Sequence, residues 1–161
     1  MSPWAPKLQS MHSIIRYPLL NSTNSRYQIK QIERSNMLQK SPMYAYIPAK
    51  DIARARNFYE QTLGFQAKEE YAGGVVYEFG KGTACFLYPT PNAGTSQASQ
   101  AFWSVDDVER EVAELKARGV VFEEYDMPGI KMHNSIASGG GAKTAWFKDS
   151  EGNILAVSQR L

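Results

Sequence analysis

The sequence predicts an α+β fold built from two tandem βαβββ modules. The chain has 161 residues, a length typical of one domain, and 43% of them are hydrophobic. An extended stretch, an amphipathic helix and three short strand segments follow one another twice. The aspartates that open the two helices, Asp51 and Asp107, give a repeat period of about 56 residues. Since neither copy can bury its sheet face alone, we expect the two modules to pack side by side.

The first module, residues 43–98, begins with an extended stretch that ends at Asp51. Asp51 is the predicted N-cap, because its carboxylate can accept hydrogen bonds from the first free backbone N–H groups of the helix. Apolar residues then recur at helical spacing until Gly64, the predicted helix stop. Three strands separated by glycine-containing turns are predicted at residues 66–70, 75–79 and 83–88.

The second module, residues 99–161, repeats this order. Its helix is predicted to begin after Asp107 and to end at Gly119. The long stretch between the strands predicted at 121–125 and 142–148 contains three consecutive glycines. We expect it to be an irregular connection, with the glycines as a flexible lid or strand lead-in. Strands are predicted at residues 121–125, 142–148 and 153–159.

Charge is distributed unevenly along the chain. Residues 1–40 hold six Lys or Arg against one Glu, whereas the remainder holds twelve basic and fifteen acidic residues. We expect residues 1–40 to be a basic extension that is disordered or dispensable, with Met37 as a natural start of the domain. Organellar targeting and a nucleic-acid-binding arm are the alternatives. The mildly acidic body, residues 41–161, is not expected to bind nucleic acid.

Other function classes are excluded by composition. No run approaches the ~18 apolar residues that a membrane span needs, so no membrane partner is expected. The single cysteine, Cys85, forms no intramolecular disulfide and indicates a reducing, cytoplasmic compartment. Two histidines and one cysteine also exclude Cys₂His₂ and Cys₄ zinc sites.

Three segments carry a family signature: IPAKDIARARNFYEQTLGF, VDDVEREVAELKARGVVFEE and TAWFKDSEGNILAVSQ. In combination they resemble the vicinal oxygen chelate superfamily of glyoxalases, bleomycin-resistance proteins and extradiol dioxygenases. The resemblance covers about residues 43–161. It implies two βαβββ modules whose curved sheets enclose one cavity, and a homodimer in which modules of different subunits complete each other's cavities.

The resemblance also implies four positions for metal ligands, usually a His on the first strand and a Glu on the last strand of each module. Those positions carry Tyr44, Phe86 (or Tyr88 after a register slip), Gln100 and Ala156. None is a strong ligand for a divalent cation. We therefore expect no metal and no cofactor, which removes the Lewis-acid step of glyoxalase and dioxygenase chemistry.

What remains is a predicted cavity lined by neutral aromatic and amide side chains. Such a lining suits a flat, partly apolar ligand that a few hydroxyl and amide groups orient. The alternative is that each aromatic ring simply fills the core. The predicted ligand-binding residues are Tyr44, Tyr46, Tyr77, Phe86, Tyr88, Gln100, Phe102, His133 and Trp146.

Two further residues bear on catalysis. His133 lies in the irregular connection expected to border the cavity mouth, where it is a candidate general base or, alternatively, an exposed histidine without function. Cys85 is interpreted as an inert core residue.

The sequence thus predicts a cytoplasmic, metal-free, bleomycin-resistance-like protein that binds a small organic molecule. A metal-independent lyase, isomerase or hydrolase of the same fold, and an interaction module without a ligand, are the alternatives.

Overall fold

The structure, a computed structural model, describes residues 38–126 and 130–161. The chain divides into two units, Met1–Ser41 and Pro42–Leu161. The described part of the first unit contains one 3₁₀ turn, Leu38–Lys40. The expectations for residues 1–37 lie outside the described residues. No helix in the described part of the chain is long and apolar enough to cross a membrane.

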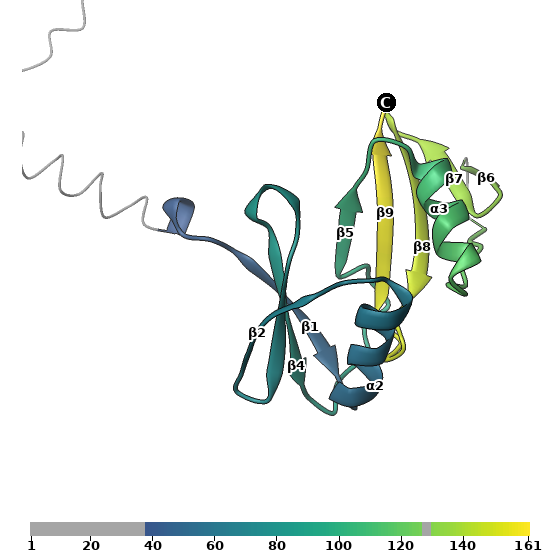
Figure 1. The fold of residues 1–161 in the computed structure, drawn as a ribbon. Helices are drawn as coiled ribbons and strands as arrows, with labels where there is room; N and C mark the ends of the chain where they lie inside the picture. Colours follow the sequence, from purple (N-terminus) through teal and green to yellow (C-terminus); the bar gives the residue numbers. More distant parts are fainter. Residues whose placement is uncertain (1–37, 127–129) are drawn as a thin grey trace, which may run out of the picture. The chain divides into compact units, whose positions relative to one another are not determined.

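The first module folds into a four-stranded sheet with the order β1-β4-β3-β2 (Figure 1). β1 runs parallel to β4, and the other pairs are antiparallel. The three strands predicted after the helix are confirmed, each displaced by one residue. Their bounds and that of the first strand are β1 Tyr44–Ala49, β2 Ala67–Tyr71, β3 Gly74–Glu78 and β4 Ala84–Pro89.

Asp51 caps the first helix, as predicted. Its Oδ1 accepts a hydrogen bond from the Arg54 backbone N–H at 3.0 Å, where α2 (Ile52–Asn57) begins. The helix continues into a wider π-helical turn, η2 (Phe58–Thr62). It ends before Gly64, whose φ of +80° lies in the left-handed region that glycine adopts without a Cβ clash.

The second module forms a five-stranded sheet with the order β5-β9-β8-β7-β6 (Figure 1). Its helix, α3 (Val108–Ala117), is capped by Asp107, whose Oδ1 accepts from the Arg110 N–H at 3.0 Å. The strand predicted at 142–148 is confirmed, and the last strand is displaced by one residue. The bounds are β5 Ala101–Ser104, β6 Lys131–His133, β7 Ile136–Gly139, β8 Ala142–Lys148 and β9 Ile154–Arg160.

Two predictions for the second module are wrong. The segment predicted as a strand at 121–125 contributes only a single bridge, between Phe122 and Phe147. The connection predicted to be irregular instead contains the β6–β7 hairpin. Its turn residues Asn134 and Ser135 have φ of +52° and +70°. Two successive positive φ values match the right-handed twist of the flanking strands, so this pair closes the hairpin without a glycine.

One hydrophobic core joins the two modules on the helix-facing sides of their sheets. Tyr59 and Leu87 of the first module belong to the same buried cluster as Val108, Phe147 and Leu155 of the second. This shared core explains why residues of both repeats form one unit, and it leaves the opposite face of each sheet without a helix.

A buried polar turn adds a second connection between the modules. The β8–β9 turn contains Asp149 and Asn153, which are 6% and 0% exposed. The Tyr59 hydroxyl donates to Asp149 Oδ2 at 2.6 Å, and Asn153 Nδ2 donates to the Pro48 carbonyl oxygen at 2.8 Å. The sequence identified these residues only as a turn, because nothing local shows that their polar groups bond to a distant helix and strand.

Candidate functional site

The helix-free face of the first sheet carries a cluster of aromatic rings. Tyr46 on β1 lies opposite Phe86 on β4, and residues directly opposite each other point to the same face. The Tyr46 ring meets Phe86 edge to face at 5.6 Å and Tyr88 at 5.1 Å, both between ring centroids. Alternation along β1 places Tyr44 on the same side. The structure thus brings four of the predicted ligand residues together.

A fifth ring, Tyr71 at the end of β2, completes this cluster and was missed from the sequence. Tyr71 stacks on Phe86 with centroids 4.6 Å apart and planes 10° from parallel. Its partner across the strands is Gly74. A Cβ at Gly74 would lie 2.6 Å from Phe86 Cζ and 2.3 Å from the Leu87 carbonyl oxygen, so this glycine leaves the space that Phe86 occupies. The sequence feature that could have identified it is the position of Tyr71 directly before the Ala72-Gly73 turn, at the end of a strand.

We call Tyr44, Tyr46, Tyr71, Phe86 and Tyr88 the aromatic face. Phe86 forms its floor at 6% exposure, whereas Tyr46 is 64% exposed. A large ring that packs against two neighbours and still shows most of its surface marks an open apolar patch with a hydroxyl at its edge.

The prediction that Tyr77 lines the cavity is wrong. Tyr77 lies opposite Cys85 on the helix-facing side, where it is fully buried and stacks on Tyr59 at 5.7 Å. Its hydroxyl donates to Glu60 Oε1 at 3.1 Å, and burial with the Glu60 charge raises the pKa of the phenol. Position along the chain alone does not decide which face Tyr77 takes, because that depends on the register of β3 against β4.

The helix-free face of the second sheet carries a row of three side chains, one on each of β5, β9 and β8. Phe102 lies opposite Ala156, which lies opposite Trp146. Phe102 is 65% exposed, and Trp146 is partly covered by Tyr125, with ring centroids 5.7 Å apart. Burial, followed by the Glu123 charge, raises the pKa of Tyr125, so its hydroxyl stays protonated. Sequence reasoning placed Tyr125 at the end of the strand predicted at 121–125 and did not include it in the site.

Gln100 lies just before β5, and the nitrogen and oxygen of its side-chain amide differ in their hydrogen bonding. Its Nε2 donates to Asn153 Oδ1 at 3.3 Å, which fixes the orientation of the amide. Its Oε1 is buried and has no hydrogen-bond partner among the described residues. A buried acceptor without a donor is costly, so this oxygen is suited to a donor from outside the described part of the chain.

The structure does not place His133 at a cavity mouth. His133 is exposed on β6 and lies opposite Ile136, which belongs to the helix-side core. Its neighbour Met132 lies opposite Ala137 and therefore takes the other face. The prediction treated this segment as irregular, whereas the hairpin register turns the imidazole away from the helix-free face.

The four positions that the family uses for metal ligands carry a poor donor set here. Phe86 and Ala156 have no donor atom, Gln100 offers only an amide oxygen, and Tyr44 offers a phenol hydroxyl, so neither imidazole nor carboxylate is present. No group of three His, Cys, Asp or Glu among residues 38–126 and 130–161 is arranged to hold a metal ion. These residues do not fit a divalent cation.

Cys85 lies on the helix-facing side of β4. Burial raises the pKa of the Cys85 thiol to about 12, so the group stays protonated and unreactive near neutral pH.

The family model described as the Glyoxalase/Bleomycin resistance protein/Dioxygenase superfamily matches residues 40–157. Among solved structures, TnmS3, an antibiotic binding protein from Streptomyces sp. CB03234, is 22% identical with a TM-score of 0.57, covering 76% of this chain and 97% of that one. Lactoylglutathione lyase from Agrobacterium tumefaciens is 17% identical with a TM-score of 0.53, covering 74% of this chain and 93% of that one.

A glyoxalase/bleomycin resistance protein/dioxygenase from Alicyclobacillus acidocaldarius is 18% identical with a TM-score of 0.56, covering 76% of this chain and 92% of that one. No curated protein matches the sequence. At these identities the solved structures establish the fold alone. By the residues that the family model matches and its two tandem modules, each a strand and a helix followed by further strands, the chain belongs to the glyoxalase/bleomycin resistance protein/dioxygenase superfamily.

Proposed function

We propose that this protein binds a small, partly aromatic organic molecule on the aromatic face, without a metal ion. The observation that carries the proposal is the exposed Tyr46 ring, 64% open although it packs edge to face against Phe86 and Tyr88. Exposed rings held by their neighbours in one orientation lose little entropy when a flat ligand stacks on them. The hydroxyls of Tyr44 and Tyr46 would orient the polar groups of such a ligand.

Two observations support metal-free binding over metal-dependent lyase chemistry. The donor set at Tyr44, Phe86, Gln100 and Ala156 offers no imidazole or carboxylate to a cation. Among the proteins that share the fold, TnmS3 is described as an antibiotic binding protein. We do not propose catalysis through His133, because the hairpin register directs it to the opposite face.

We further propose that two copies of the chain form a homodimer that encloses the ligand. The aromatic face would cover a flat ligand on one side only. The face around Phe102 and Trp146 of a second copy is suited to cover its other side. Both faces carry rings that are mostly open in one chain: Tyr46 at 64% and Phe102 at 65%. We place this binder in the cytoplasm, where the single thiol of Cys85 stays reduced.

Titration with 8-anilino-1-naphthalenesulfonate tests the binding proposal. We expect saturable binding to the full chain and at least about tenfold weaker binding by Tyr46→Ala, the range for loss of one aromatic contact. Val121→Ala is the matched control, since Val121 is 78% exposed and lies outside the aromatic face. Unchanged affinity in a folded Tyr46→Ala protein would overturn the assignment of this face.

A further inference from the structure

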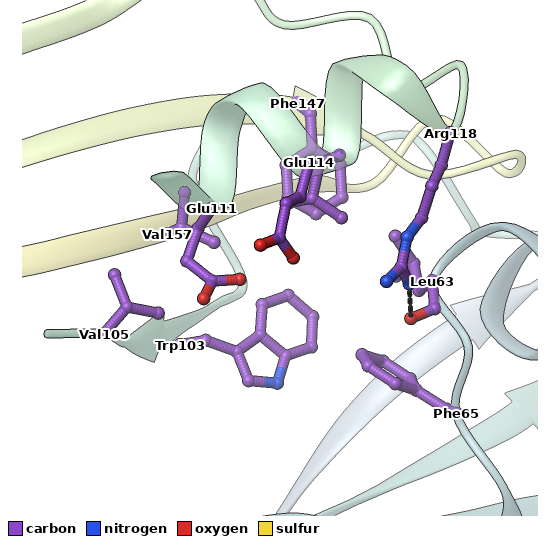
Figure 2. Close-up of a pocket in the computed structure, with 10 residues that line it drawn as sticks. Leu63, Phe65, Trp103, Val105, Glu111, Glu114, Arg118, Phe147 and Val157 are labelled. Carbon is purple, nitrogen blue, oxygen red and sulfur yellow. Dashed lines mark hydrogen bonds between the residues drawn. The ribbon is translucent and has the colours of Figure 1, made fainter. Parts of the chain in front are cut away.

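A separate cavity of about 210 Å³ lies on the helix side of the sheets (Figure 2), and no residue of the aromatic face lines it. Residues of both modules line it, and it adjoins one side of α3. The lining residues that a ligand would meet include Leu63, Phe65, Trp103, Glu111, Glu114 and Arg118.

The apolar wall of this cavity is an aromatic cluster around Trp103. The indole stacks on Phe147, with centroids 6.3 Å apart and planes 14° from parallel, and meets Phe65 at 5.6 Å. Trp103 is only partly buried, so part of its ring surface is open to the cavity that it lines. The part of the indole that lines the cavity offers its π electrons to an incoming cation.

Two carboxylates lie across from this wall. Glu111 and Glu114 are three residues apart on α3 and therefore share a side of the helix. Figure 2 shows both carboxylates directed toward the Trp103 indole. Their ion-pair partner is Arg110, at the long distances of 3.5 and 3.9 Å. No side chain in the described part of the chain donates a hydrogen bond to either carboxylate, so both keep acceptor capacity for a ligand.

Arg118 is the cationic residue that lines the cavity, and Figure 2 shows it directed toward Leu63. Its Nη1 donates to the Leu63 carbonyl oxygen at 3.2 Å and lies so close to Gly64 that a Cβ there would be 3.1 Å away. This guanidinium is therefore held against the first module rather than paired with the two glutamates. The lining consequently carries two carboxylates against one cation.

We propose that this cavity binds a small organic monocation: a protonated amine carried on an aromatic or apolar body. The ammonium group would lie between Glu111 and Glu114 and over the Trp103 ring, where it gains charge-assisted hydrogen bonds and a cation–π contact. The body would pack against Leu63 and Phe65. Since a cavity of roughly 150 Å³ holds benzene, the volume here admits an amine with a single ring.

Isothermal titration of the full chain with phenethylamine hydrochloride at low ionic strength tests the proposal. We expect one saturable site per chain, and at least about tenfold weaker binding of 3-phenylpropanoate, which has a similar body and the opposite charge. The double variant Glu111→Gln/Glu114→Gln keeps side-chain size and should bind the amine at least about tenfold more weakly. Glu109→Gln is the matched control, because Glu109 lies on the same helix but pairs with Lys143 outside the cavity.

A second readout separates this site from the aromatic face. Tyr46→Ala should leave amine binding unchanged, and the NMR signal of the Trp103 indole N–H should shift on titration. Absence of saturation at millimolar amine, unchanged affinity in the folded double variant, or equal binding of 3-phenylpropanoate or zwitterionic phenylalanine would overturn the proposal. Each of these outcomes leaves binding at the aromatic face unaffected.

Discussion

Glu151 of the second module accepts two hydrogen bonds from the guanidinium of Arg54 in the first, at 2.7 Å from Nε and 3.0 Å from Nη2. Its Oε2 also accepts from the backbone N–H groups of Lys50 and Asp51 at 2.8 and 3.1 Å. The Glu151 side chain is fully buried, whereas that of Arg54 is 53% exposed. One carboxylate thus fixes the β8–β9 turn to the start of α2.

Replacing this carboxylate should destabilise the fold. We expect Glu151→Gln to lower the free energy of unfolding by about 1–3 kcal/mol, because the backbone N–H groups of Lys50 and Asp51 and the Arg54 guanidinium all lose a charged, buried acceptor. Urea unfolding followed by circular dichroism measures the change. Glu78→Gln is the control, since its exposed ion pair with Lys68 at 3.4 Å contributes little. An equal loss in both variants would contradict the role of Glu151.

The same residue predicts an acid-sensitive step. Burial raises the pKa of Glu151, but hydrogen bonds from Arg54 and from the backbone of Asp51 and Lys50 outweigh it and hold the pKa below the ordinary 4.5. A depressed pKa in the folded state stabilises the protein above pH 4.5 and loses that contribution as the pH falls below it. The difference in melting temperature between the wild type and Glu151→Gln should therefore shrink below pH 4.5. A difference that stays constant down to pH 3 would contradict this linkage.

Tyr59→Phe tests the buried hydrogen bond to Asp149. The hydroxyl lies 2.6 Å from Asp149 Oδ2 in a buried pair, so its removal should cost about 1–3 kcal/mol in unfolding free energy. Tyr71→Phe is the control: Tyr71 is 46% exposed and should change stability by less than about 0.5 kcal/mol. Guanidinium melts of both variants give the comparison, and equal midpoints would contradict the prediction.

Gly74→Ala should disturb the packing of Phe86, the most buried ring of the aromatic face. The added Cβ would meet the Phe86 ring and the Leu87 carbonyl oxygen, so we expect a loss of about 1–3 kcal/mol, the usual cost of overpacking, together with weaker binding of the naphthalenesulfonate probe. Gly80→Ala is the control, because a Cβ there meets no heavy atom within 4 Å. Thermal melts and probe titrations report both effects, and a Gly74→Ala protein with wild-type stability would contradict the packing argument.

The proposed homodimer predicts a sedimenting mass near twice the 18.0 kDa of the chain at micromolar concentration. Phe102→Glu should shift the population toward the single chain, because it places a charge in the apolar face proposed to meet the second copy. Val121→Glu is the control at another exposed apolar site. A wild-type mass of 18.0 kDa in analytical ultracentrifugation would contradict the homodimer.

Local rules were sufficient for most of the secondary structure. Asp51 and Asp107 cap their helices because capping needs only a carboxylate three residues from a free N–H group. The β6–β7 hairpin was missed because its Asn134-Ser135 turn lacks the usual glycine, and positive φ at both residues depends on the strand pairing around them.

The candidate site was predicted less completely. Alternation along β1 and β4 identified Tyr46, Phe86 and Tyr88, because one strand determines which of its residues share a face. Tyr71 and Tyr77 could not be assigned in this way, since their faces depend on how β2 and β3 register against β4. A shift of one residue in that register exchanges the two faces.

The sequence by itself determined the repeat, the helix caps, the alternation of the outer strands and the residues at the family's metal positions. The caps and the alternation depend on neighbours within a few residues, the repeat on comparing two stretches about 56 residues apart, and the metal positions on the family resemblance. Only the tertiary structure decided that Glu151 binds Arg54, that Tyr77 and His133 turn toward the helix side, and that Trp103 and α3 enclose a cavity. Those contacts join residues far apart in the chain, so they follow from how the sheets pack and not from any local pattern.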